Sequence, residues 1–169
     1  MGTLNIFTDA LAADPGDPEG YRGAAVDLGR LLGPSELMVK VIEIAPGNRL
    51  CPYHYEYVEE WLVVLSGPVH VRTPAGVSSL ADGAVMRFPA GPEGAHQVFS
   101  PAETGEPARV LMFSADADPA VCVYPDSDKL AVFTHSGHDE VFVRRGEPTS
   151  HLEYYDGELP PAALPPVAD

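Results

Sequence analysis

Basic residues are scarce in this chain, and their scarcity excludes several classes of partner. Of 169 residues, only 10 are Lys or Arg against 25 Asp or Glu, which gives a formal net charge of −15 at pH 7. Nucleic acids and anionic membrane surfaces are bound by clustered Lys and Arg, so neither partner is expected. The field of such a protein also repels anionic substrates unless a metal ion neutralises it locally.

Cysteines and long apolar runs are lacking as well. Cys51 and Cys122 are the only two cysteines, too few for a disulfide framework. We interpret both as packing residues, with a place at a site mouth as the alternative for Cys51, which lies three residues before His54. No apolar run reaches the length of a membrane span, and residues 1–13 lack the basic start and apolar stretch of a signal peptide. These absences predict a cytoplasmic protein.

Helical periodicity is also missing, whereas turn residues are abundant. The 18 prolines and 16 glycines suit short strands joined by tight turns, and 45% hydrophobic residues are typical of one globular domain. Apolar segments at even spacing predict an all-β sandwich or barrel of about ten strands. These segments are 21–32, 37–45, 61–65, 69–73, 77–80, 84–88, 96–99, 109–113, 120–124, 130–133 and 140–143.

Two separated stretches of the sequence carry histidines and carboxylates. Along an extended strand, His54, Glu56 and Glu60 share one face with Leu62, and a barrel brings His96 to them from another strand. Carboxylates buried beside apolar residues are costly without a partner, and a divalent cation supplies one. The pattern therefore predicts a metal site, with a general base or a hydrogen-bonded core acid as the alternatives for Glu56.

The same stretches resemble the two motifs of the cupin family. The first motif is matched by Gly47, His54-Tyr55-Glu56, Glu60 and Gly67, and the second by Gly83, Pro89-Ala90-Gly91, His96 and Ser100. The resemblance implies a double-stranded β-helix, or jelly-roll barrel, in residues 37–114. Residues 1–36 then form an N-terminal arm, and residues 115–169 form a C-terminal extension that packs on the barrel. The resemblance to cupins also implies a homodimer, because cupins commonly cover the edges of their sheets by pairing with a second copy.

The chain departs from the family pattern at four points, the first being a spacer before His54 that is one residue longer than the usual form. Glu56 replaces the second histidine of the first motif, Ser100 replaces an asparagine, and the spacer between Gly91 and His96 is two residues longer. When the family's metal-binding positions are carried over to this chain, the resemblance implies four ligands: His54, Glu56, Glu60 and His96. This set suits Mn²⁺, Fe²⁺ or Zn²⁺. Without Glu56, the two histidines and Glu60 resemble the facial arrangement of non-haem iron oxygenases. Glu56 is then the catalytic base.

The resemblance implies a metal-dependent enzyme acting on a small organic molecule, and it favours a dioxygenase. A cupin isomerase or epimerase and a non-catalytic small-molecule-binding cupin are the alternatives, because many cupins bind no metal. We interpret the loop histidines His135 and His138 as solvated and not as ligands. Trp61 and the neighbouring tyrosines, Tyr53, Tyr55 and Tyr57, are expected as core or dimer contacts and not as cavity lining.

Overall fold

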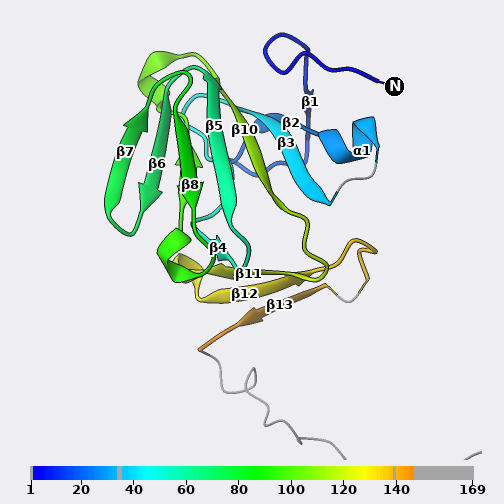
Figure 1. The fold of residues 1–169 in the computed structure, drawn as a ribbon. Helices are drawn as coiled ribbons and strands as arrows, with labels where there is room; N and C mark the ends of the chain where they lie inside the picture. The colour runs from blue at the N-terminus through cyan, green and yellow to red at the C-terminus, as the bar shows by residue number, and fades with distance from the viewer. Residues whose placement is uncertain (1, 34–35, 139, 147–169) are drawn as a thin grey trace, which may run out of the picture.

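The computed structural model describes residues 2–33, 36–138 and 140–146 (Figure 1). The part of the expected C-terminal extension beyond residue 146 lies outside these residues. In chain order the elements are β1 (Ala12–Ala13), β2 (Gly23–Asp27), α1 (Leu28–Leu32), β3 (Leu37–Ile44), β4 (Tyr55–Glu56), β5 (Glu60–Ser66), β6 (Val69–Thr73), β7 (Gly76–Leu80), β8 (Val85–Phe88), η1 (Pro92–Gly94), β9 (Gln97–Phe99), η2 (Ala102–Thr104), β10 (Ala108–Ala115), β11 (Ala120–Tyr124), η3 (Pro125–Ser127), β12 (Lys129–Phe133) and β13 (Val141–Arg144).

Within the described residues, the strands form three antiparallel sheets. A six-stranded sheet has the order β1-β2-β3-β10-β5-β8, and a three-stranded sheet has the order β7-β6-β9. A four-stranded sheet, β13-β12-β11-β4, lies across the lower end of the other two in Figure 1. The predicted all-β class is therefore confirmed, and β4 links the barrel to the sheet that residues 120–144 build.

The apolar core lies between the six-stranded and the three-stranded sheets. Side chains alternate along each strand, so Leu62 and Val64 of β5 are buried on the inner face while Val63 between them is only partly buried. The register Met112↔Leu62 and Val110↔Val64 places residues of β10 beside them on that face. The buried members of this cluster are Ile44, Leu62, Val64, Val69, Val71, Phe88, Val98, Ala108, Val110 and Met112.

The N-terminal segment extends the six-stranded sheet. Strand β2 pairs with β3 along its full length, and β1 pairs with β2. The side chain of Arg109, 7% exposed, donates hydrogen bonds to the carbonyls of Phe7 and Asp9 at 2.9 and 2.5 Å. Arg109 therefore holds residues near the N-terminus against the outer face of the sheet.

The helix α1 contradicts the expectation that residues 21–32 form only a strand. The segment 21–32 divides into β2 and the five-residue helix α1, whose N-cap Asp27 accepts a hydrogen bond from the backbone N–H of Arg30 at 3.0 Å. An Asp side chain at this position satisfies one of the free donors of the first turn. A helix of five residues is too short to leave a periodic pattern in the sequence.

Candidate metal centre

The two histidine-bearing stretches meet through their backbones. His54 and His96 form an isolated antiparallel bridge, in which each backbone N–H donates to the carbonyl of the other at 3.1 and 2.8 Å. The centroids of the two imidazole rings lie 4.7 Å apart. The fold thus brings together the two histidines that the sequence predicted as ligands.

Backbone carbonyls fix the orientation of both imidazoles. The Nδ1 atom of His54 lies 3.0 Å from the carbonyl oxygen of Pro52, and Nδ1 of His96 lies 2.9 Å from that of Gly94. A carbonyl only accepts, so both Nδ1 atoms carry the proton and both Nε2 atoms carry a lone pair. Ligating histidines commonly donate their other nitrogen to a carbonyl in this way.

The loop before His96 explains the longer spacer of the second motif. Its additional residues form the single turn η1, Pro92–Gly94, and Gly94 supplies the carbonyl that orients His96. A Cβ atom on Gly94 would lie 1.7 Å from the carbonyl oxygen of Pro89, so a side chain at this position would displace the loop. Phe88 stacks on the His96 ring at 3.6 Å between centroids, which also restrains its orientation.

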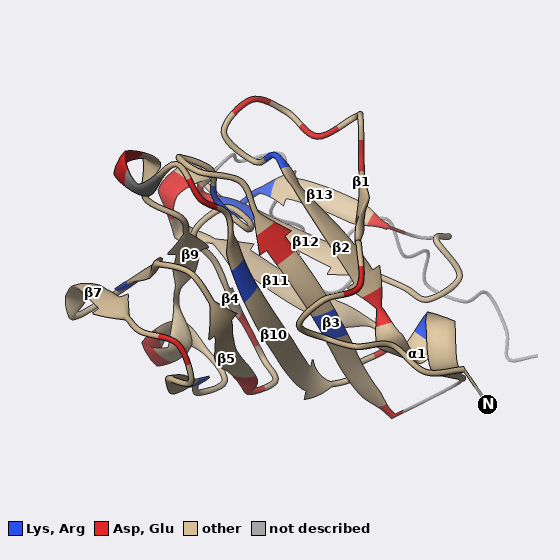
Figure 2. Ribbon diagram, turned by 90° about the horizontal axis from the view of Figure 1, so that it is seen from above, with Lys and Arg blue, Asp and Glu red and all other residues tan. Residues whose placement is uncertain are grey.

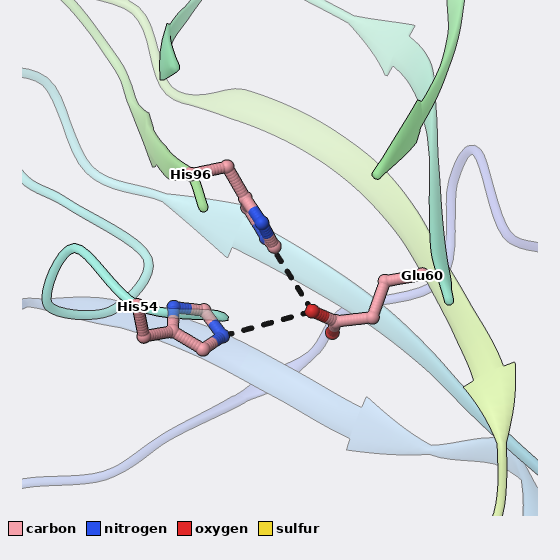
Figure 3. Close-up of side chains that lie close together, drawn as sticks. All are labelled: His54, Glu60 and His96. Carbon is pink, nitrogen blue, oxygen red and sulfur yellow. Dashed lines mark ion pairs between the residues drawn. The ribbon is translucent and has the colours of Figure 1, made fainter. Parts of the chain in front are cut away.

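Both Nε2 atoms face one carboxylate oxygen. Oε2 of Glu60, at the start of β5, lies 3.7 Å from Nε2 of His54 and 3.7 Å from Nε2 of His96 (Figure 3). Two donors that each lie about 2.1 Å from an ion can be at most about 4.2 Å apart, so each of these separations fits a shared ion. Within the described part of the chain, the buried Nε2 of His96 has no hydrogen-bond partner, and a metal ion would provide one. The three residues therefore fit a divalent metal ion, and we name them the His-Glu-His set.

Burial shifts the pKa of each member of this set. Desolvation and the nearby His54 lower the pKa of His96 to about 3, and desolvation lowers that of His54. Desolvation, followed by the charge of Glu56, raises the pKa of Glu60 to about 8, against an opposing effect of Lys40. Both imidazoles are thus neutral at pH 7, as ligands must be, and among the described residues no Lys or Arg forms an ion pair with Glu60.

Glu56 lies beside the His-Glu-His set but makes different contacts. Glu56 belongs to β4. Its carboxylate lies near His54 and near Cys122 of β11, and the ligand atoms of the three residues lie within 4.8 Å of one another. Desolvation raises its pKa, against the effect of a hydrogen bond from Cys122. The sequence placed Glu56 correctly on the face of His54, but it missed Cys122. Its role as a fourth ligand to the His-Glu-His set stays a prediction.

A cavity of about 690 Å³ opens onto these carboxylates. Its lining includes His54, Glu56 and Glu60, and His96, only 1% exposed, is not part of it. Lys40 also lines the cavity, on the same face of β3 as its apolar neighbours Met38, Ile42 and Ile44. Sequence reasoning missed Lys40, although a single lysine among alternate apolar residues of a strand is a detectable signal. Arg22, Arg30 and Arg49 are the other basic residues of the lining.

The remaining candidates lie elsewhere. His135 is 2.8 Å from Asp116 and 3.5 Å from Asp118 in an exposed cluster, and within the described ranges no ligand group includes His135 or His138. Tyr53 and Tyr55 pack with Ala95 and Val123 in a second apolar cluster, as core contacts. Figure 2 shows acidic residues on many loops around the strands and fewer basic ones, in line with the net charge.

Comparison with known proteins supports the fold. No family model and no curated protein matches the sequence. A cupin-superfamily sugar phosphate isomerase from Silicibacter pomeroyi is 22% identical, with a TM-score of 0.71 over 85% of this chain and 93% of that chain. The polyketide cyclase RemF from Streptomyces resistomycificus is 18% identical, with a TM-score of 0.56 over 71% of this chain and 83% of that one. A cupin-like protein from Thermotoga maritima is 18% identical, with a TM-score of 0.53 over 67% of this chain and 86% of that one.

These similarities show the fold and not the activity, because all three identities are low. The chain shares the fold of these cupin structures, and its antiparallel sheets fit the jelly-roll barrel that the two motifs predicted. Among the described residues there is no helix long and apolar enough to cross a membrane.

Proposed function

We propose that this protein is a metal-dependent enzyme that acts on a small organic molecule, with the metal held by the His-Glu-His set. One observation carries the proposal: two neutral imidazole nitrogens and one carboxylate oxygen converge beside a cavity of about 690 Å³, which His54 and Glu60 line. That volume lies in the range of small-molecule sites. The oxygen and nitrogen donors suit Fe²⁺, Mn²⁺ or Zn²⁺.

We propose dioxygenase chemistry as the reaction class. Two histidines and one carboxylate leave open positions, which is the arrangement that non-haem iron oxygenases use. A ferrous ion bound there would supply the electrons that O₂ activation needs. The protein's own contribution is to hold both Nε2 lone pairs in place through Pro52 and Gly94 and to line the cavity with Glu56, whose pKa is raised by desolvation. Lys40 provides a cation for an anionic group of the substrate.

A second candidate is an isomerase or epimerase, and the position of Glu56 favours it. Isomerisation beside a carbonyl needs a group that takes a proton from one carbon and returns it to another. Glu56 lines the cavity and has a raised pKa, so it is suited to such a transfer. The similar fold of a sugar phosphate isomerase agrees with this candidate, and Lys40 would face the phosphate.

The experiment measures metal first and turnover second. Protein purified without chelator is expected to hold metal near one equivalent after incubation with Fe²⁺ or Mn²⁺. Loaded protein is then incubated with panels of small carboxylates, enols and sugar phosphates, in air and without O₂. Consumption of O₂ with incorporation of its oxygen into product supports the dioxygenase, whereas uptake of solvent deuterium without O₂ supports the isomerase.

Two variants serve as matched controls for this experiment. Glu56→Gln is expected to retain metal and lose turnover, and Lys40→Met to raise KM for anionic substrates more than it lowers kcat. Substoichiometric metal that does not increase on adding Fe²⁺, Mn²⁺ or Zn²⁺ contradicts the proposed enzyme and leaves the non-catalytic binding module.

We also propose that the protein forms a homodimer through the outer face of the six-stranded sheet. Trp61 stacks on Phe113 there, with 6.1 Å between ring centroids, and the adjacent Val85 is 59% exposed. These residues and Val63 make an apolar row that crosses β10, β5 and the edge strand β8. Light scattering is expected to give twice the chain mass, and Val85→Asp is expected to give the monomer.

A further inference from the structure

The strand β11 brings a thiol to the face that carries Glu56. In the antiparallel pairing of β4 with β11, Cys122 lies directly opposite Glu56. Directly opposite residues in a pair of strands project to the same side, and His54, two residues before Glu56, projects to that side as well. The ligand atoms of His54, Glu56 and Cys122 all lie within 4.8 Å of one another. The C-terminal extension thus supplies the sulfur at this point.

These three groups are shielded from water to a large extent, and Cys122 donates a hydrogen bond to Glu56. Cys122 is 3% exposed and His54 is 7% exposed, while Glu56 is partly buried. Glu56 and Glu60 repel each other electrostatically across the site. A cation beside Glu56 would reduce that repulsion, and a histidine, a carboxylate and a thiolate together are a typical donor set for zinc and similar ions.

The tautomer of His54 limits how the site is occupied. Its Nδ1 proton is directed to the carbonyl of Pro52, so only Nε2 offers a lone pair to a metal. That same Nε2 faces Glu60 in the His-Glu-His set. A single lone pair binds one ion at a time, so an ion bound with Glu56 and Cys122 excludes an ion bound with Glu60 and His96.

We propose that His54, Glu56 and Cys122 form a second metal-binding set, which takes thiophilic divalent ions such as Cd²⁺ or Zn²⁺ in competition with the His-Glu-His set. On binding, the thiol proton of Cys122 passes to solvent and a sulfur–metal bond replaces the S–H bond. The proposal extends the proposed metal centre and depends on it only through the shared His54. A thiophilic ion would therefore displace the ion that the reaction uses and inhibit the enzyme.

Cadmium titration followed by ultraviolet absorption tests this set directly. Thiolate-to-cadmium charge transfer is expected to rise to a plateau at one equivalent in the wild-type protein. Cys122→Ser is expected to abolish the absorption and to weaken Cd²⁺ binding by more than about 100-fold, since even loss of an outer partner costs 10- to 100-fold. Cys51→Ser is the matched control, because its Sγ lies 3.4 Å from Nδ1 of His54, the nitrogen that offers no lone pair. It is expected to retain the full absorption.

Two outcomes would overturn the proposal: stoichiometric Cd²⁺ binding without charge-transfer absorption, or absorption that survives Cys122→Ser and disappears in Cys51→Ser. If Cys122→Ser does not fold, the wild-type protein gives the answer through alkylation and mass spectrometry. Cd²⁺ is then expected to protect Cys122 from alkylation, and Glu56→Gln to weaken that protection by at least about 10-fold. Alkylation of Cys122 that proceeds equally with and without Cd²⁺ contradicts the proposal.

One further variant separates this proposal from the proposed function. His96→Ala is expected to lose Mn²⁺ and Fe²⁺ while it retains the cadmium absorption, and His54→Ala is expected to lose both. In the wild-type protein, Cd²⁺ is expected to displace Mn²⁺. Simultaneous binding of one equivalent of each ion contradicts the shared use of His54. If Mn²⁺ and Fe²⁺ fail to bind while the cadmium absorption appears, the proposed function fails and the second set stands.

Discussion

Two regions of one barrel interior differ in what their side chains require. On β5, Leu62 is fully buried in the apolar core, and Glu60, two residues earlier on the same face, lies among imidazoles and a second carboxylate. The apolar region gains stability from burial alone. The polar region is stable at pH 7 only with neutral histidines and with carboxyls that keep a proton or face a cation. The same strand therefore supports the fold at one point and prepares a binding site at the next.

The largest expected effect removes the metal and leaves the core intact. His96→Ala deletes a ligand of the His-Glu-His set and is expected to weaken Mn²⁺ or Fe²⁺ binding by more than about 100-fold. Metal analysis after gel filtration measures this loss. His138→Ala, in an exposed loop, is the control and is expected to retain the metal. Loss of metal in His138→Ala with retention in His96→Ala would show that the wrong histidines were assigned.

A change in the apolar region is expected to lower stability and to leave metal binding unchanged. Leu62→Ala creates a cavity beside Val64 and Val110 and is expected to lower the free energy of unfolding by roughly 2–5 kcal/mol. Urea denaturation measures this difference. Metal affinity of the folded fraction is expected to stay within about threefold of wild type, since the ligands are unchanged. A large loss of affinity at unchanged stability would contradict the separation of the two regions.

Glu60→Gln is expected to stabilise the metal-free protein at alkaline pH. The pKa of Glu60 is about 8 in the folded protein against 4.5 for an ordinary Glu. Between these values the folded state binds more protons than the unfolded state, so the free energy of unfolding falls as pH rises from about 4.5 to about 8. The glutamine removes this fall. We expect roughly 2–4 kcal/mol of added stability near pH 9 and little difference near pH 4.

The metal provides the control for that prediction. Saturating Mn²⁺ is expected to stabilise the wild-type protein and not Glu60→Gln, because the amide is a poor ligand for the ion. Thermal unfolding at matched pH measures both effects. A wild-type protein whose stability does not change between about pH 5 and pH 9 would mean that Glu60 is not buried in the way described.

The smallest expected effect lies on the surface. Arg72 pairs with Asp126 at 2.6 and 3.0 Å and lies over the ring of Tyr53, 4.0 Å from its centroid. The pair is largely solvated, so Arg72→Gln is expected to cost only about 1 kcal/mol. Denaturation in low and high salt measures this cost, which should shrink with salt. A loss as large as that of Leu62→Ala would mean that this contact holds the four-stranded sheet in place.

Motif spacing was sufficient to predict much of the fold and the proximity of His54, Glu60 and His96, whose role as metal ligands stays a prediction. Turn residues and alternation gave the strands from residue 37 to 133 within a few positions, since both signals are local. Alternation also placed Glu56 on the face of His54. The short elements β1, β4 and α1 were missed because two to five residues carry too little pattern.

The site residues that sequence reasoning missed were missed for a different reason. Lys40 and Cys122 come from β3 and β11, and their proximity to Glu56 and Glu60 depends on strand register between distant segments. Nothing in the local sequence around Cys122 specifies that it pairs with Glu56. The additional residues before His96 were visible in the sequence, but only the structure shows that η1 absorbs them and leaves His96 in position.

The reciprocal backbone bonds between His54 and His96 have a consequence for motion. Any separation of β4 from the segment before β9 would break both bonds and move the two imidazoles apart, so that they could no longer both face Glu60. An ion that ligates all three residues opposes this separation, so opening of this end of the barrel becomes less frequent when the ion is bound. Amide hydrogen exchange at His54 and His96 should therefore slow in proportion to occupancy, and these two amides can report binding without any substrate.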